Sequence, residues 1–179
     1  VAAAAFGAYM NQGQICMSTE RIIVVDEIAD AFVEAFARKV ETLTAGDPTE
    51  GKAPLGSVVN AAAADRIREL IEDAVQKGAR LIGGGGSGTI LNAAALDDVT
   101  PQMRLYYEES FGPVTSIIRV GDADEAVRVA NESDMGLSAA VFGRDQARAM
   151  QIASRIESGI CHVNGPTVHD EAQMPFGGV

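Results

Sequence analysis

The chain has 179 residues, of which 47% are hydrophobic and 22% are charged; this composition is typical of one folded domain and excludes a disordered segment. Its net charge of −11, without any basic cluster, would repel polyanions, so neither nucleic acid nor an anionic membrane is an expected partner. No apolar run approaches the ~20 residues needed to cross a bilayer, and no basic-then-apolar leader is present. The two cysteines, Cys16 and Cys161, lie far apart without zinc-ligand spacing, so we expect a reducing, cytoplasmic location with no metal site and no disulfide.

The first feature along the chain is a single cysteine between a helix and a strand. The alanine run at residues 2–5 favours a helix, and the β-branched run at residues 22–25 favours a strand. Cys16 lies between them, in a polar turn that Gly13 opens. Rigid flanks of this kind can present a thiolate, the reactive form of cysteine, to a substrate. Most free cysteines are buried small side chains, so the placement alone leaves both interpretations open.

Two amphipathic helices follow. Asp26 is a plausible N-cap for a helix over residues 28–43, whose apolar residues recur at helical spacing before Gly46. Asn60 is a plausible N-cap for a second helix, which Gly78 ends.

A glycine run separates the next two short strands. The strands are predicted at residues 79–82 and 89–91, and residues 83–86 are all glycine. Glycines can let backbone amides approach a phosphate. This run has neither GxGxxG nor GxxxxGK[ST] spacing, and no helix pattern follows it, so a flexible connector is the favoured interpretation.

A pair of carboxylates precedes the most apolar strand of the chain. Glu108 and Glu109 come just before a turn at Phe111 and Pro113, and a strand is predicted over residues 114–120. Adjacent carboxylates can serve as general acid and base, but neighbours in sequence more often form a solvated acidic turn.

The remaining elements alternate between helix and strand. After an N-cap at Asp122 they are a helix to Asn131, a strand at 136–142, a helix at 147–156, a strand at 160–164 and a long loop from 165 onward. The alternation predicts an α/β fold with a largely parallel β-sheet and helices on both faces. Ligands in such folds collect at the carboxyl ends of strands, which points to the loops that follow Val120, Phe142 and Asn164.

Only two histidines are present. His162 falls within a predicted strand, where a packed or surface side chain is more common than a base. His169 lies in the final loop beside two acidic residues, which is a more plausible place for a site residue. A cysteine–histidine dyad stays open, although no spacing favours it.

Five segments, in this order along the chain, resemble the aldehyde dehydrogenase superfamily. They are residues 11–16 (NQGQIC), 108–114 (EESFGPV), 135–142 (MGLSAAVF), 159–164 (GICHVN) and 175–179 (PFGGV). Residues 16–21 (CMSTER) and 164–171 (NGPTVHDE) are most similar to the branch of vanillin, salicylaldehyde and benzaldehyde dehydrogenases.

The resemblance implies roles for particular residues. Cys16 would attack a small-molecule aldehyde, which the branch implies is aromatic, and the reaction would pass through a thiohemiacetal and a thioester to the carboxylic acid. The backbone N–H of Cys16 would form half of the oxyanion hole. NAD or NADP would be the cofactor, with Glu109 on the nicotinamide ribose hydroxyls and Phe111 beside the nicotinamide. The residues implied at the substrate pocket are Ile15, Met17, His169 and Phe176.

The resemblance also implies a longer parent protein. Residues 1–179 would be its catalytic, cysteine-bearing domain, without the cofactor domain, the C-terminal tail, the general-base glutamate and the oxyanion-hole asparagine. We therefore expect the isolated chain to be inactive and the parent enzyme to be a homodimer or homotetramer. Two alternatives remain: a non-catalytic binding or assembly module of the same fold, and a thiol redox or metal protein that uses Cys16 and Cys161.

Overall fold

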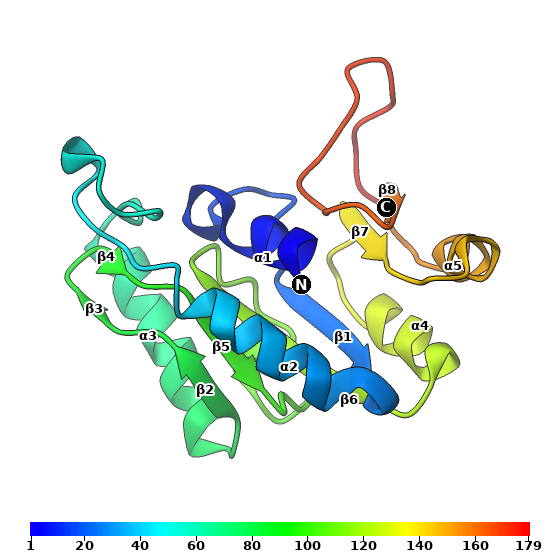
Figure 1. Cartoon of the computed structure of the whole chain (residues 1–179), viewed down its shortest axis with the longest axis horizontal. Coiled ribbons are helices and arrows are strands. Elements are labelled where there is room, and N and C mark those ends of the chain that lie inside the picture. The colour runs from blue at the N-terminus through cyan, green and yellow to red at the C-terminus, as the bar shows by residue number, and fades with distance from the viewer.

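A four-stranded sheet is the centre of the molecule in the computed structural model, which describes residues 1–179 (Figure 1). Its strands lie in the order β1 (Arg21–Val25), β6 (Val114–Val120), β5 (Ala94–Asp97) and β2 (Arg80–Gly83). β1, β6 and β5 are parallel, and β2 runs antiparallel to β5. The prediction of an α/β fold with a largely parallel sheet is confirmed.

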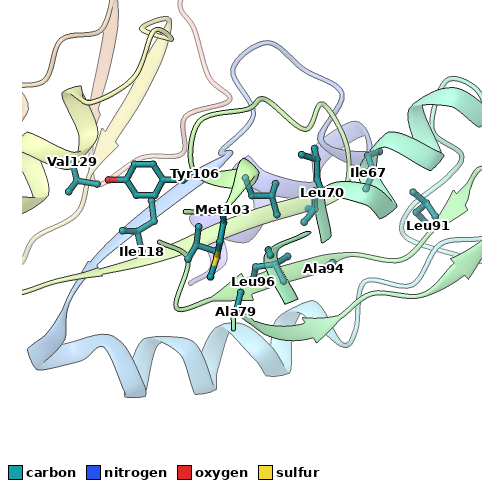
Figure 2. Close-up of a cluster of buried hydrophobic side chains, with 14 of the residues drawn as sticks. Ile67, Leu70, Ala79, Leu91, Ala94, Leu96, Met103, Tyr106, Ile118 and Val129 are labelled. Atoms are coloured by element: carbon teal, nitrogen blue, oxygen red, sulfur yellow. The ribbon is translucent and has the colours of Figure 1, made fainter. Parts of the chain in front are cut away.

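Helices cover both faces of this sheet. α1 (Ala2–Tyr9) and α2 (Asp26–Val40) share one apolar cluster with Ala95 of β5 and Ile117 of β6. α3 (Ala61–Gln76) and α4 (Ala123–Asn131) share the other cluster with the next residue along each strand, Leu96 and Ile118 (Figure 2). Because neighbouring residues of a strand point to opposite faces, each strand contributes side chains to both clusters.

α3 and α4 begin where short polar side chains accept hydrogen bonds from the first turn. Asn60 accepts from the Ala63 N–H at 2.8 Å, and Asp122 accepts from the Glu125 N–H at 2.9 Å, so both predicted N-caps are confirmed. The predicted cap at Asp26 is wrong, because α2 begins at Asp26 itself, following Val25, and ends at Val40. Asp26 then stabilises the helix through its charge in the first turn.

The strand β5 is absent from the sequence prediction. Ala94 and Ala95 have low β-propensity, and all four residues of the strand are buried, so they show no alternation of apolar and polar positions. Tertiary contacts hold the strand instead: the Ala94 N–H donates to Pro113 O at 2.8 Å, and the hydroxyl of buried Tyr9 donates to Ala94 O at 2.8 Å.

The glycine run leads from β2 into a small antiparallel hairpin. The hairpin pairs β3 (Gly86–Ser87) with β4 (Ile90–Leu91). All four glycines, 83–86, have positive φ, and a Cβ at Gly86 would overlap the carbonyl of Ile90. The run is therefore a tight connector whose backbone conformation favours glycine at all four positions and whose first and last positions leave no room for a side chain.

A second, smaller sheet stands apart from the first. β7 (Ser138–Val141) and β8 (Ile160–Val163) form a parallel pair, which α5 (Gln146–Ala153) connects (Figure 1). These elements agree with the predicted ones to within a few residues at their ends. None of the helices has the length and the hydropathy that crossing a membrane would require.

Candidate active site

The parallel register of β1 and β6 brings two distant loops to the same end of the sheet. Arg21 pairs with Ser116, so the cysteine turn before β1 and the glutamate loop before β6 are neighbours. We define the cysteine turn as residues 13–19 and the glutamate loop as residues 108–112. Both loops precede their strands, whereas the sequence predicts that ligands bind in loops that follow strands.

The cysteine turn is closed by local hydrogen bonds. The Ser18 N–H donates to Ile15 O at 2.8 Å, and the Ile15 N–H donates to Ser18 Oγ at 3.3 Å. Cys16 at the tip is exposed, and its N–H donates to no acceptor within the chain. A nucleophilic sulfur and an available backbone donor therefore occur on one residue, while Ile15 and Met17 beside it are half-buried.

Strained backbone leads into the cysteine turn. Asn11, Gln12 and Gly13 follow one another with φ of 50°, 58° and 69°, a region that residues other than glycine seldom occupy. The Gln14 side chain ties the segment down, because its Oε1 accepts from the Val59 N–H at 2.8 Å. Backbone strain of this kind gathers at functional sites and persists only where the surroundings hold it.

Gly13 is also the point where the two loops touch. A Cβ on Gly13 would overlap the carbonyl oxygen of Gly112 and would lie 2.7 Å from its carbonyl carbon. Gly112 in turn packs against Ile67 of α3, where a Cβ would overlap Cδ1. The cysteine turn and the glutamate loop therefore meet backbone to backbone, and neither glycine leaves room for a side chain.

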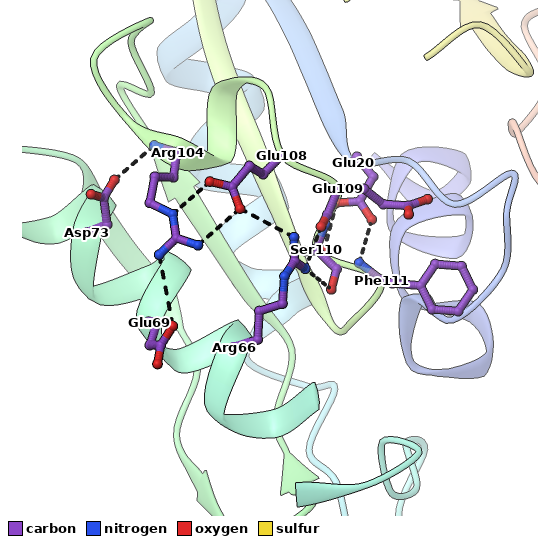
Figure 3. Close-up of polar contacts among 9 residues, drawn as sticks. All are labelled: Glu20, Arg66, Glu69, Asp73, Arg104, Glu108, Glu109, Ser110 and Phe111. Atoms are coloured by element: carbon purple, nitrogen blue, oxygen red, sulfur yellow. Dashed lines mark hydrogen bonds and ion pairs between the residues drawn. The ribbon is translucent and has the colours of Figure 1, made fainter. Parts of the chain in front are cut away.

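The two carboxylates of the glutamate loop have different surroundings. Glu108 is held by Arg104, with Nε–Oε1 at 2.7 Å and Nη2–Oε2 at 3.0 Å, and this hydrogen bonding lowers the pKa of its carboxyl (Figure 3). Glu109 is exposed and makes no side-chain hydrogen bond or ion pair. The pair is thus one structural carboxylate and one free carboxylate.

Phe111 completes the glutamate loop. Its φ is 48° and 41% of its surface is exposed, and its ring points away from the polar cluster in Figure 3. No other aromatic ring stacks on it.

Sequence reasoning overlooked Glu20, which lies just after the cysteine turn. Its carboxylate accepts hydrogen bonds from Ser110 and Phe111 of the glutamate loop. Burial raises the pKa of Glu20, and the hydrogen bonds from Ser110 and Phe111 offset part of that rise. No local sequence pattern marks Glu20, because the strand that follows it begins with Arg21 and is only partly buried.

The final loop reaches the cysteine turn through its first residues. Thr167 is buried, and its hydroxyl lies 2.7 Å from that of Thr19, while the Ser138 hydroxyl donates to Thr167 O at 2.8 Å. Farther on, His169 Nε2 bonds to Glu171 Oε1 at 3.2 Å, with both side chains exposed. Phe176 is 53% exposed, and the loop extends away from the sheet (Figure 1).

The second cysteine and the first histidine of the chain lie together on β8. Cys161 is half-buried, and burial raises the pKa of its thiol. His162 is also half-buried, and its Nε2 is buried without a hydrogen-bond partner. Neither cysteine forms a hydrogen bond with a histidine, so the structure shows no cysteine–histidine dyad.

Comparison with known proteins places this geometry in a family. The model of the aldehyde dehydrogenase family matches residues 1–179. The chain belongs to the aldehyde dehydrogenase family. Across essentially its whole length it is 64% identical to vanillin dehydrogenase of Pseudomonas fluorescens, 49% to salicylaldehyde dehydrogenase of Pseudomonas putida and 42% to benzaldehyde dehydrogenase of Bacillus subtilis. It spans 37% of the length of each of these relatives.

Solved structures of aldehyde dehydrogenases superpose closely on the chain. Salicylaldehyde dehydrogenase from Pseudomonas putida G7, complexed with salicylaldehyde, matches with a TM-score of 0.94 at 47% identity, over 99% of this chain and 37% of that one. NADP-dependent glyceraldehyde-3-phosphate dehydrogenase from Bacillus halodurans, complexed with NADP, matches with a TM-score of 0.95 at 41% identity over the same shares. The predicted resemblance to the family, and to its aromatic-aldehyde branch, is confirmed.

Proposed function

We propose that the chain is the cysteine-bearing catalytic part of an NAD(P)-dependent dehydrogenase that oxidises small aromatic aldehydes to carboxylic acids. The observation that carries the proposal is the pairing of exposed Cys16, whose N–H is free, with the glutamate loop docked against its turn through Gly13 and Gly112. The similarity to vanillin, salicylaldehyde and benzaldehyde dehydrogenases supports the substrate class.

Cys16 would perform the covalent chemistry. Its thiolate attacks the carbonyl carbon, a C–S bond forms, and the π electrons of the carbonyl move to oxygen. The Cys16 N–H then donates to this oxyanion; a donor in that position is typically worth about 10²–10³ in rate. After oxidation the acyl group stays on sulfur as a thioester, which suits hydrolysis because a thiolate is a good leaving group. Attack by water breaks the C–S bond, releases the acid and returns the thiolate.

Glu109 and Phe111 would bind the cofactor. The Glu109 carboxylate is exposed and unpaired, so it can accept hydrogen bonds from the two hydroxyls of a ribose. The exposed ring of Phe111, two residues on, offers an apolar surface for the nicotinamide end. NAD or NADP, when bound, supplies the acceptor for the hydride that leaves the aldehyde carbon.

Four side chains would shape the substrate pocket. Ile15 and Met17 flank the nucleophile, and the Thr19–Thr167 hydrogen bond attaches the loop that carries His169 and Phe176 to the cysteine turn. An apolar wall with few polar groups suits a small aromatic ring.

The rest of the catalytic machinery would come from other parts of a longer protein. We propose that residues 1–179 form its catalytic domain, because the chain spans 37% of the length of its relatives. A missing general base costs about 10²–10⁴ in rate and a missing oxyanion donor about 10²–10³. We therefore propose that the isolated chain is inactive, and that the parent enzyme is a cytoplasmic homodimer or homotetramer.

The test is aldehyde-dependent reduction of NAD⁺ and NADP⁺ by the full-length protein that carries this chain, with vanillin, salicylaldehyde, benzaldehyde and, for comparison, acetaldehyde. We expect the aromatic aldehydes to have the higher kcat/KM. Cys16→Ser should lower kcat at least about a thousandfold, because it removes the nucleophile. Cys161→Ser is the matched control and should keep kcat within about threefold.

Two outcomes would refute the proposal. If Cys16→Ser keeps the activity of the unaltered protein, Cys16 is not the nucleophile. If no aldehyde reduces either cofactor while the chain still folds, a non-catalytic binding or assembly module of the same fold becomes the better interpretation.

A further inference from the structure

Side-chain hydrogen bonds alone hold residues 109–111 of the glutamate loop. Glu109, Ser110 and Phe111 take part in no backbone–backbone hydrogen bond. Phe111 also has a positive φ, a conformation that an unrestrained phenylalanine would leave. Something outside the loop must therefore hold these three residues in place.

Glu20 binds the donors of the loop. Its Oε2 accepts from the Ser110 N–H at 3.1 Å and from the Ser110 hydroxyl at 2.7 Å, and its Oε1 accepts from the Phe111 N–H at 3.0 Å (Figure 3). Both carboxylate oxygens are thus used, and both consecutive N–H groups of the loop are satisfied.

Arg66 of α3 binds the acceptors of the same loop. Its Nη1 donates to Glu109 O at 2.6 Å and to Ser110 O at 3.3 Å, and its Nη2 lies 3.4 Å from the Glu108 carboxylate (Figure 3). The loop is therefore held between a carboxylate on one side and a guanidinium on the other.

Glu20 differs from Glu108 and Asp97, because it has no cationic partner. It forms no ion pair, whereas Glu108 pairs with Arg104 and the buried carboxylate of Asp97 pairs with Arg80 and Arg119. Burial of a carboxylate without a cation is costly and raises the pKa of Glu20. Carboxylates in such surroundings are found preferentially at functional sites.

Glu20 is also fixed to the sheet by its own backbone. Its carbonyl accepts from the Ser116 N–H at 2.9 Å and from the Thr115 hydroxyl at 3.2 Å, where β6 begins beside β1. Glu20 lies four residues after Cys16 in the sequence. Its side chain thus connects the segment that leaves the nucleophile with the loop that carries Glu109 and Phe111.

We propose that Glu20 is a positioning residue: it sets the place of Glu109 and Phe111 relative to Cys16, and through them the affinity for the nicotinamide cofactor. This inference rests on the proposed function for the role of Glu109 and Phe111. Glu20 itself touches neither the aldehyde nor the cofactor.

The decisive variant is Glu20→Gln in the full-length protein. Glutamine has the same shape, but its NH₂ group would face an N–H or hydroxyl donor of the loop, so at least one charge-assisted hydrogen bond is lost. We expect the Kd for NAD⁺ or NADP⁺, measured by calorimetry with the cofactor alone, to rise at least about tenfold. Amide exchange at Ser110 and Phe111 should accelerate, and the rate of Cys16 alkylation by iodoacetamide should stay within about twofold.

Two further variants complete the test: one is a matched control and the other is a second, independent perturbation of the loop. Glu125→Gln is the matched control, because the Glu125 carboxylate also accepts from a backbone N–H, that of Gly121 at 2.8 Å, far from the cysteine turn; the Kd should not change. Arg66→Met removes the hydrogen bonds on the other side of the loop, from a side chain that is 42% exposed, and should raise the Kd in the same direction. This variant keeps the inference testable if Glu20→Gln does not fold.

The outcomes separate this inference from the proposed function. Unaltered protein that binds neither cofactor refutes the proposed function, and with it the role given to Glu109. If the unaltered protein binds cofactor and the Kd is unchanged in both the Glu20→Gln and the Arg66→Met variants, only the positioning role is refuted. Loss of Cys16 reactivity and of overall stability in step with the rise in Kd would also refute it, because Glu20 would then be a general structural residue.

Discussion

Replacing Gly13 by alanine tests whether the cysteine turn and the glutamate loop are docked as the structure shows. Two costs arise at this position. Alanine at φ of 69° is strained by about 1–2 kcal/mol. Its Cβ would also overlap the carbonyl of Gly112, and forcing an added methyl into a packed site costs a further 1–3 kcal/mol or so.

Gly51 provides a control that separates the two costs. Its φ of 62° is close to that of Gly13, but nothing lies within 4 Å of a Cβ built there. Gly51→Ala should therefore cost only the backbone strain, about 1–2 kcal/mol. Gly13→Ala should cost about 2–5 kcal/mol in total, so the difference between the variants, about 1–3 kcal/mol, measures the close approach of the two loops.

Urea unfolding followed by circular dichroism measures both variants. Tryptophan fluorescence cannot be used on the chain itself, because it contains no tryptophan. In the full-length protein, Gly13→Ala should also lower kcat/KM for the aldehyde, whereas Gly51→Ala should not. Equal losses of stability in the two variants would refute the docked arrangement of the loops.

Three further predictions concern the two thiols, the buried carboxylate of Asp97 and the helix cap at Asn60. Limiting iodoacetamide should label Cys16 faster than Cys161, because Cys16 is exposed while burial raises the pKa of Cys161; equal rates by mass mapping would contradict this. Burial opposes ionisation of Asp97, but hydrogen bonds from Arg119 and Arg80 outweigh this effect and lower the pKa of its carboxyl. The ionised carboxylate therefore stabilises the fold at any pH above the pKa of the unfolded state, about 3.9, and this stabilisation is lost as the pH falls through the lower pKa of the folded state. Asp97→Asn should cost about 3 kcal/mol at neutral pH and weaken the loss of stability in acid, as urea titrations at several pH values would show; an unchanged pH dependence would count against the assignment. Asn60→Ala should cost about 1 kcal/mol in thermal unfolding, and a cost near zero would mean that the cap contributes nothing.

The sequence predicted most elements whose signals are local. The strand predicted at residues 114–120 agrees with β6, and the predicted N-caps at Asn60 and Asp122 are confirmed. An N-cap depends only on the first turn of the helix that it begins. The prediction failed where tertiary contacts determine the secondary structure. β5 is a strand because Tyr9 and Pro113 bind Ala94, and neither residue is near Ala94 in the sequence.

The candidate site divides in the same way. Cys16 and Glu109 lie in short segments that resemble the family, and this resemblance is what singled them out as candidates. The structure adds that Glu109, unlike Glu108, is free of ion pairs. Glu20 could not be found, because its hydrogen-bond partner Ser110 lies 90 residues away along the chain. Only the parallel register of β1 and β6 makes them neighbours, and no local pattern encodes that register.

The separation of the β7–β8 pair from the main sheet has a consequence for local unfolding. No strand ladder joins the two sheets, and the ties between them are side-chain bonds such as that of Thr19 with Thr167 and the ion pair of Arg155 with Asp124. Such a unit can open by itself, at a lower free energy than the sheet to which Cys16 and its neighbouring loops are attached. The final loop, which extends from β8, would open with it, while the cysteine turn and the glutamate loop keep their contacts with each other.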